Sequence, residues 1–252
     1  MKLTIHHLYA DMMNLYGDRG NVISIKKRCE WRGIEVEVVD VGLGERVNPT
    51  PNGCDIFLFG GGQDREQGLL TEDLAGSKGA DLRAISADGG VILGVCGGYQ
   101  LMGSHYVTPE GDNLAGIGIF DLYTEPRGPE EERLIGNVLI KSRDLEGNAR
   151  ELVGFENHGG RTRLGEVTEP LGEVILGFGN NGGDGQEGAR SGHTFGTYLH
   201  GSLLPKNPWF TDMLILAALR RGADDNFELE PLEDDSENAA FAAAVERARG
   251  RR

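Results

Sequence analysis

The chain has 252 residues and a formal net charge of −15 at pH 7. This acidic balance argues against sequence-independent binding to nucleic acid and against docking on anionic lipid, because both need a cationic surface. Apolar residues make up 38% of the chain and charged residues 26%, as in ordinary globular proteins. The three cysteines include no CxxC pair, so neither a disulfide framework nor a zinc site is expected.

The N-terminus lacks the uninterrupted apolar core of a signal peptide. No run of apolar residues approaches the length that spans a bilayer. We therefore expect a cytoplasmic protein without direct membrane insertion.

The first hundred residues alternate between strand and helix patterns. Residues 34–41 alternate and are rich in valine, whereas 55–59 and 91–95 are continuous apolar runs, typical of strands buried on both faces. Asn21 is expected to cap the first helix. The expected strands are 3–9, 34–41, 55–59 and 91–95, and the expected helices are 22–32, 65–75 and 79–88. This order predicts an α/β fold of the flavodoxin-like kind, with a doubly wound, mostly parallel sheet and helices on both faces.

The second half of the chain has a different pattern. Strand patterns at 116–123, 134–141, 152–156 and 173–178 follow one another without long helices, which predicts an antiparallel extension. A last strand at 194–199 and a helix at 207–221 follow, the helix being opened by Asn207-Pro208. We expect one domain over residues 1–222, followed by an acidic C-terminal tail and helix over 223–252. Residues 224–237 hold eight acidic residues and no basic ones, as solvated segments do.

The clearest chemical signal is Gly94-Val95-Cys96-Gly97-Gly98, which lies between a buried strand and a helix pattern. This is the arrangement of a nucleophile elbow, where the chain doubles back and neighbouring residues must be small. A thiol at such a turn is exposed to the N-terminus of the following helix, which favours the thiolate. We therefore predict that Cys96 is a nucleophile, whereas Cys29 and Cys54 are expected in the core.

Two further segments end predicted strands. Gly60-Gly61-Gly62-Gln63-Asp64 exposes backbone N–H groups at the edge of the sheet where ligands collect. Gly196-Thr197-Tyr198-Leu199-His200-Gly201 places a histidine where it could reach a thiol across the sheet. His158, beside Gly159-Gly160, is a competing base, and residue types alone favour His200 only slightly.

Taken together, these segments resemble the class I glutamine amidotransferases, specifically the cobyric-acid-synthase-like branch. Within that branch the chain is similar to the glutaminase subunits of lipid II isoglutaminyl synthases over about residues 3–220. The segments that carry this closer likeness are DMMNLYGDRGN (11–21), GGGQDREQ (60–67), GFENHGGR (154–161) and GFGNN (177–181).

The resemblance implies roles for individual residues. Cys96 would attack the side-chain amide of L-glutamine to form a thioester, and His200 would transfer the proton from the thiol to the leaving ammonia. The N–H groups of Gly61 and Gly97 would form the oxyanion hole. Gln100 would contact the substrate glutamine, the alternative being an ordinary surface position on a helix.

Arg133 matches the arginine that binds the α-carboxylate of glutamine in these subunits. Residue types alone do not separate Arg133 from Arg65 or Arg161. Most class I enzymes carry a glutamate two residues after the histidine, where this chain has Ser202. The cobyric-acid-synthase-like branch also lacks this glutamate. A carboxylate that orients the imidazole could come from elsewhere in the chain or from a partner.

The resemblance also implies a partner, because ammonia must be consumed where it is released. The chain has no GxxxxGK[ST] phosphate loop, so ATP is expected on the partner and no cofactor in this chain. The expected partner is a Mur-ligase-like synthase subunit, joined in a heterodimer, which would amidate the D-glutamate of lipid II to D-isoglutamine. The alternatives are an amidotransferase for cobyrinate or cobyric acid, a class I-like cysteine hydrolase, and a non-catalytic binding module.

Overall fold

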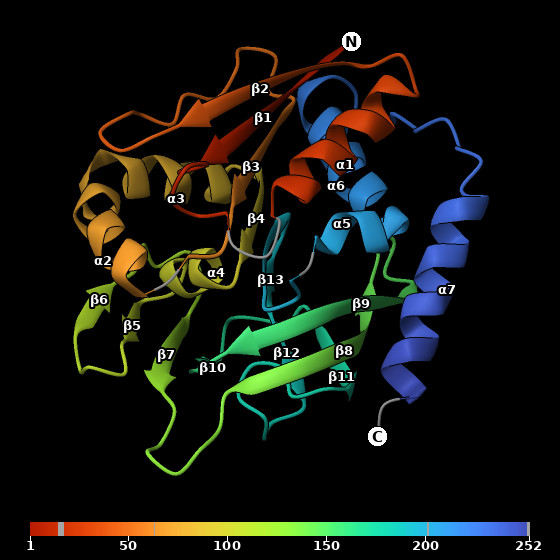
Figure 1. The fold of residues 1–252 in the computed structure, drawn as a ribbon. Coiled ribbons are helices and arrows are strands. Elements are labelled where there is room, and N and C mark those ends of the chain that lie inside the picture. Colours follow the sequence, from red (N-terminus) through yellow and green to blue (C-terminus); the bar gives the residue numbers. More distant parts are fainter. Residues whose placement is uncertain (15–17, 63, 201, 251–252) are drawn as a thin grey trace.

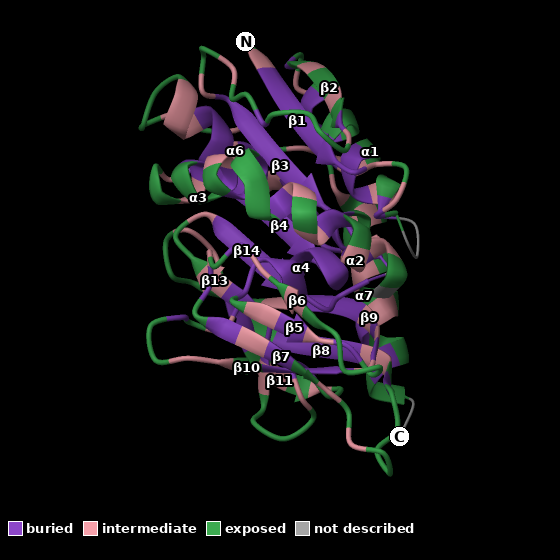
Figure 2. Ribbon diagram, turned by 90° about the vertical axis from the view of Figure 1, so that its left-hand side faces the viewer, coloured by how far each residue is buried: buried purple, intermediate pink, exposed green. Residues whose placement is uncertain are grey.

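The computed structural model describes residues 1–14, 18–62, 64–200 and 202–250. Within them a six-stranded sheet forms the centre of the fold (Figure 1), built from β1 (Lys2–Leu8), β2 (Glu35–Val41), β3 (Asp55–Phe59), β4 (Val91–Val95), β13 (Ala189–Ser191) and β14 (Thr194–Thr197). The strand order is β13-β14-β4-β3-β1-β2, and every neighbouring pair is parallel except β13 with β14. Figure 2 shows β3, β4 and β14 buried along their lengths, and β1 buried beyond its N-terminal end.

Helices cover both faces of this sheet, so the expectation of a doubly wound α/β fold is confirmed. α1 (Arg19–Glu30) and α6 (Pro208–Gly222) lie on one side (Figure 1). α2 (Asp64–Asp73) and α3 (Gly79–Ala87), joined by the π-helical turn η2 (Leu74–Lys78), lie on the other. The short helices α4 (Gly97–Leu101) and α5 (Leu203–Lys206) follow the sheet strands β4 and β14. As predicted, Asn207 precedes α6 and Pro208 is its first residue.

The expected antiparallel extension is present as two four-stranded sheets. One has the order β10-β7-β5-β6 and includes one parallel pair, β5 with β7. The other has the order β12-β11-β8-β9 and is antiparallel throughout. Their strands are β5 (His105–Val107), β6 (Asn113–Ala115), β7 (Leu122–Pro126), β8 (Leu134–Arg143), β9 (Ala149–His158), β10 (Gly160–Leu164), β11 (Gly172–Leu176) and β12 (Gln186–Glu187).

Two local predictions were wrong. The strand expected at 116–123 begins only at Leu122, because the backbone N–H groups of residues 117–120 bond to carbonyls at the end of α4 and just beyond it. Asn21 does not cap α1 but lies inside it, and its Oδ1 accepts the backbone N–H of Leu204. The side chain therefore joins α1 to α5, close to the end of the strand that leads to His200.

The C-terminal segment is attached at two places. α7 (Asp235–Gly250) runs beside β8 and β9 (Figure 1), where Val245 and Ala248 are buried. Before it, Asp234 accepts two hydrogen bonds from Arg28, whose guanidinium also donates to both carboxylate oxygens of Asp212. Most other residues of 224–237 are exposed or half-buried, as expected for a solvated segment. We refer to Arg28, Asp212 and Asp234 as the Arg28 clasp.

Candidate active site

Three chain segments meet at the carboxyl ends of β3, β4 and β14. Gly94 in β4 pairs with Phe59 on one side and with Gly196 on the other, so the continuations of the three strands emerge next to one another. These continuations carry Gly61, Cys96 and His200. Ligands of open parallel sheets collect at this edge.

The chain turns at Cys96 as a nucleophile elbow does. The cysteine has φ 50° and ψ −106°, a conformation that L-residues rarely adopt. A Cβ on Gly98 would lie 2.4 Å from the carbonyl oxygen of Phe59, and one on Gly94 would lie 2.4 Å from the sulfur of Met102. Glycine is therefore required on both sides of the cysteine. The backbone N–H of Cys96 is held by the carbonyl oxygen of Thr197 at 2.8 Å.

The nucleophile candidate and the base candidate lie beside Gly61. A Cβ built on this glycine would lie 3.1 Å from Cε1 of His200 and 3.4 Å from Cβ of Cys96. Any side chain at position 61 would therefore press on both groups. Gln63 and Gly201, which belong to the same sequence segments, lie outside the described residues.

His200 is held in place by its backbone. Its N–H donates to the carbonyl oxygen of Phe155 at 2.7 Å, and Phe155 returns a hydrogen bond at 3.3 Å. Burial lowers the pKa of His200 to about 3, and the positive charges of His158, Arg133 and Lys206 add to this effect. The imidazole is therefore neutral at physiological pH.

The competing histidine, His158, is fixed by other contacts. Its Nδ1–H donates to the carbonyl oxygen of Gly160 at 2.9 Å, and its ring stacks on Tyr198 with 3.6 Å between centroids. Its Nε2 lies 3.9 Å from a carboxylate oxygen of the buried Glu156. These contacts hold the His158 ring against Tyr198.

Gln100 is buried rather than exposed on a helix surface, so the alternative interpretation of this residue was wrong. Its Oε1 accepts from Nε2 of Gln67 at 3.2 Å, and its own Nε2 donates to the hydroxyl of Tyr198 at 3.1 Å. Gln67 was missed by sequence reasoning, although it lies in the segment GGGQDREQ. A Cβ on Gly97 would lie 3.0 Å from the amide of Gln67, which places this side chain next to the elbow.

The two expected oxyanion donors differ in their surroundings. Gly97 is the first residue of α4, and the position of a Cβ on it is 3.1 Å from the backbone nitrogen of Gly62, so the two loops approach closely. The N–H of Gly61 donates to Oδ2 of Asp18 at 2.6 Å. Burial raises the pKa of Asp18 to about 7, although the hydrogen bond from Gly61 opposes this shift. Asp18 was not singled out from the sequence, although it belongs to the segment DMMNLYGDRGN.

Two of the candidate arginines, Arg161 and Arg133, differ in burial and in their contacts. Arg161 is largely buried, and its guanidinium donates to the carbonyl oxygens of Gly159, Gly160 and Glu132. Arg133 is exposed, and Asn157 orients it by accepting from Nε and from Nη2 at 3.0 Å each. The position of a Cβ on Gly159 is 3.3 Å from Nη1 of Arg133, so the guanidinium lies over the turn between β9 and β10, and its charge lowers the pKa of His200.

A buried carboxyl group supports the strand end that leads to His200. Glu187 accepts the N–H of Tyr198 at 2.7 Å and the hydroxyl of Thr197. Burial raises the pKa of Glu187 to about 8. The folded protein therefore holds this proton more tightly than the unfolded chain, and the resulting stabilisation is lost as the pH rises through this pKa.

We expect Glu187→Gln to make stability less sensitive to pH. Between about pH 5 and pH 8 the free energy of unfolding of the wild type should fall, relative to that of the variant, by on the order of 3 kcal/mol. Urea unfolding of both proteins at several pH values measures this difference. A difference that does not change with pH would contradict the raised pKa of Glu187.

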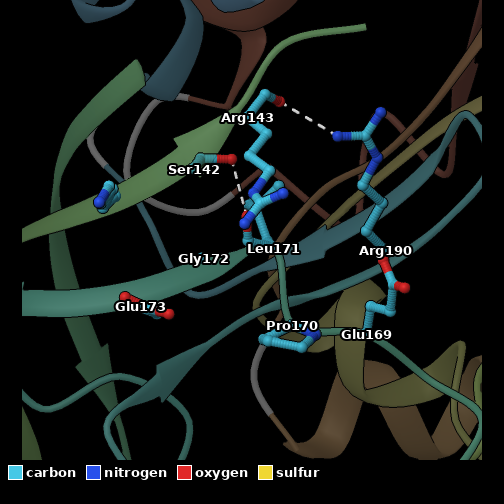
Figure 3. Close-up of a pocket in the computed structure, with 9 residues that line it drawn as sticks. Ser142, Arg143, Glu169, Pro170, Leu171, Gly172, Glu173 and Arg190 are labelled. Atoms are coloured by element: carbon cyan, nitrogen blue, oxygen red, sulfur yellow. Dashed lines mark hydrogen bonds between the residues drawn. The ribbon is translucent and has the colours of Figure 1, made fainter. Parts of the chain in front are cut away.

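Figure 3 shows a separate cavity of about 330 Å³, lined by residues of both charges from β8, β11 and β13 and the loop before β11. Arg190 donates to the carbonyl oxygen of Arg143 there, at 3.1 Å. None of the candidate active-site residues lines this cavity. In the described ranges no helix is long and apolar enough to cross a membrane.

A cysteine elbow at the carboxyl edge of a doubly wound sheet, with a histidine near it, is the arrangement expected of a class I glutamine amidotransferase. The model of the CobB/CobQ-like glutamine amidotransferase domain matches residues 4–208. The chain therefore belongs to this family and is a glutamine amidotransferase.

Relatives and solved structures agree with this assignment. The chain is 43% identical over 247 residues to the lipid II isoglutaminyl synthase (glutamine-hydrolyzing) subunit GatD of Staphylococcus aureus, covering 98% of this chain and 96% of that protein. The subunit of the same name from Streptococcus pneumoniae is 38% identical over 233 residues, which cover 92% of this chain and 86% of that protein. The PurLQS structure from Thermotoga maritima matches at a TM-score of 0.54 and 15% identity, over 88% of this chain and 97% of that one, and supports the fold alone.

Proposed function

We propose that this chain hydrolyses L-glutamine to glutamate and ammonia and supplies the ammonia to a synthase subunit that amidates lipid II. The observation that carries the hydrolytic step is the approach of Cys96 and His200 to the same side of Gly61. The thiol of Cys96 and the neutral imidazole of His200 therefore lie close together at the edge of the sheet where substrates collect.

The reaction would proceed through a thioester. His200 accepts the proton of the Cys96 thiol while the sulfur attacks the side-chain amide carbon of glutamine. The imidazolium then returns this proton to the departing nitrogen, which leaves as ammonia. In the second half, His200 takes a proton from water, the hydroxide attacks the thioester, and glutamate leaves as the thiol is restored.

Other residues would bind and orient the substrate. The N–H of Gly97, at the start of α4, would stabilise the negative charge on the substrate oxygen. Arg133, already oriented by Asn157, offers its guanidinium to the α-carboxylate of glutamine. Gln100, whose amide is fixed by Gln67 and Tyr198, would support the substrate beside the elbow.

The identity of the acceptor comes from the relatives. Both GatD proteins are named as subunits of lipid II isoglutaminyl synthase, and this chain matches them over most of its length. We infer that the partner is a Mur-ligase-like subunit, which uses ATP to activate the α-carboxyl of the D-glutamate in lipid II. Ammonia released at Cys96 would then form D-isoglutamine, and the two subunits would act as a heterodimer.

The proposal predicts that amidation of lipid II with glutamine as nitrogen donor needs both subunits. Glutamine carrying ¹⁵N in its side-chain amide is mixed with ATP, lipid II, this chain and the synthase subunit, and ¹⁵N in lipid II is measured by mass spectrometry. Omitting either protein should abolish the label. Ammonium salt at alkaline pH should replace this chain but not the synthase, because only the glutaminase step is bypassed. Amidation by this chain alone would contradict the proposal.

A further inference from the structure

A carboxylate that the proposed reaction does not use lies inside the candidate site. Asp18 is only 3% exposed, and its Oδ2 accepts the N–H of Gly61 at 2.6 Å. In the part of the chain that the structure describes, its other oxygen, Oδ1, has no hydrogen-bond partner. Burial disfavours the charged form of a carboxyl group, and a single hydrogen bond from a neutral N–H offsets only part of this cost. The pKa of Asp18 is therefore raised.

The carboxylate lies on the same side of Gly61 as the reacting groups. The position of a Cβ on Gly61 is 3.3 Å from Oδ2 of Asp18, against 3.1 Å from the ring of His200 and 3.4 Å from Cβ of Cys96. The same oxygen is 3.1 Å from the position of a Cβ on Gly60. Asp18 thus reaches the glycine loop beside the nucleophile and the base.

A simple structural role does not account for this contact. Asp18 directly precedes α1, where an aspartate commonly caps the helix, but its side chain makes no capping hydrogen bond. The nearby N–H of Arg19 is instead accepted by Asn14. Among the described residues, the side chain of Asp18 therefore bonds to the glycine loop rather than to its own helix.

We propose that Asp18 competes with the substrate oxygen for the N–H of Gly61 and so holds the free chain in a state of low activity. The inference rests on the proposed glutaminase function. An N–H that donates to a carboxylate at 2.6 Å is not available to a developing oxyanion. The γ-carboxylate of the product glutamate presents the same kind of acceptor as Asp18, so glutamate and Asp18 exclude each other from this donor.

The first test is the glutaminase activity of the free chain. We expect Asp18→Ala and Asp18→Ser to raise kcat/KM for glutamate release by up to about 10²- to 10³-fold, the range that one oxyanion donor contributes. Asp18→Asn keeps an acceptor oxygen and should give a smaller rise. Asp11→Ala, which removes an exposed carboxylate from the same loop, is the matched control. Thermal unfolding verifies that each variant is folded.

A second measurement does not depend on turnover. In the Cys96→Ala background, calorimetry should show that Asp18→Ala lowers the Kd of L-glutamate by about tenfold, because the competing carboxylate is gone. Folded Asp18→Ala and Asp18→Ser proteins whose kcat/KM equals or falls below that of the wild type would overturn the inference. That result leaves the glutaminase function standing if the wild type still releases glutamate. A wild type and variants that are all inactive, both alone and with the synthase subunit, would overturn both proposals.

Discussion

Replacing Cys96 by alanine lowers the rate of glutamate release from L-glutamine by about 10⁴-fold or more, because no thioester can form. The rate is measured with and without the synthase subunit, by coupling glutamate to a dehydrogenase. With the synthase present, Cys96→Ala should still support amidation of lipid II from ammonium salt, since the defect is confined to the glutaminase step.

The chain offers a matched control for this substitution. Cys54 is also buried, but it precedes β3 at the opposite end of the sheet, and its thiol donates to the carbonyl oxygen of Asn52. Cys54→Ala should therefore leave kcat unchanged. Glutaminase activity that survives in Cys96→Ala would remove the proposed mechanism, whatever the control shows.

Replacing His200 by alanine should lower kcat by roughly 10³-fold, because no other group in the proposal accepts the thiol proton. His158→Ala should have a smaller effect, since its ring packs on Tyr198 and bonds to Gly160 rather than lying beside Gly61. Single-turnover formation of the thioester, followed by mass spectrometry, separates the first proton transfer from hydrolysis. Loss of thioester formation in His158→Ala but not in His200→Ala would make His158 the base.

The parallel half of the fold could be predicted because its signals are local. The runs 55–59 and 91–95 have the same bounds in the sequence prediction and in the structure, since a strand covered on both faces must be apolar throughout. The antiparallel half also contains strands without a clear apolar pattern: β10 reads GRTRL, with arginine on one face and threonine between glycine and leucine on the other. Thr162 in this strand is nevertheless fully buried, because its hydroxyl bonds to those of Tyr198 and Thr124. Only the tertiary structure supplies these partners.

The residues of the candidate site also differ in whether local sequence could predict them. An elbow is encoded within a few residues, so Cys96 and its glycines could be located from the sequence. The choice of His200 over His158 needed the resemblance to a family, because each histidine is followed by a glycine and residue types alone separate them only slightly. Asp18 and Gln67 were missed because their partners, Gly61 and Gln100, lie far away in the chain or on another element.

The Arg28 clasp has a consequence for the order in which the protein can mature. The side chain of Arg28 is 3% exposed, and its two carboxylate partners follow it by 184 and 206 residues. During translation Arg28 is synthesised early, whereas its carboxylate partners, Asp212 and Asp234, are synthesised near the end. Until Asp234 has emerged, the helix that begins at Arg19 holds a cation whose final ion pairs cannot form, so the nascent chain cannot complete its native packing. A stop codon shortly before this aspartate would therefore remove two of the four hydrogen bonds of a buried cation in α1, as well as the last helix.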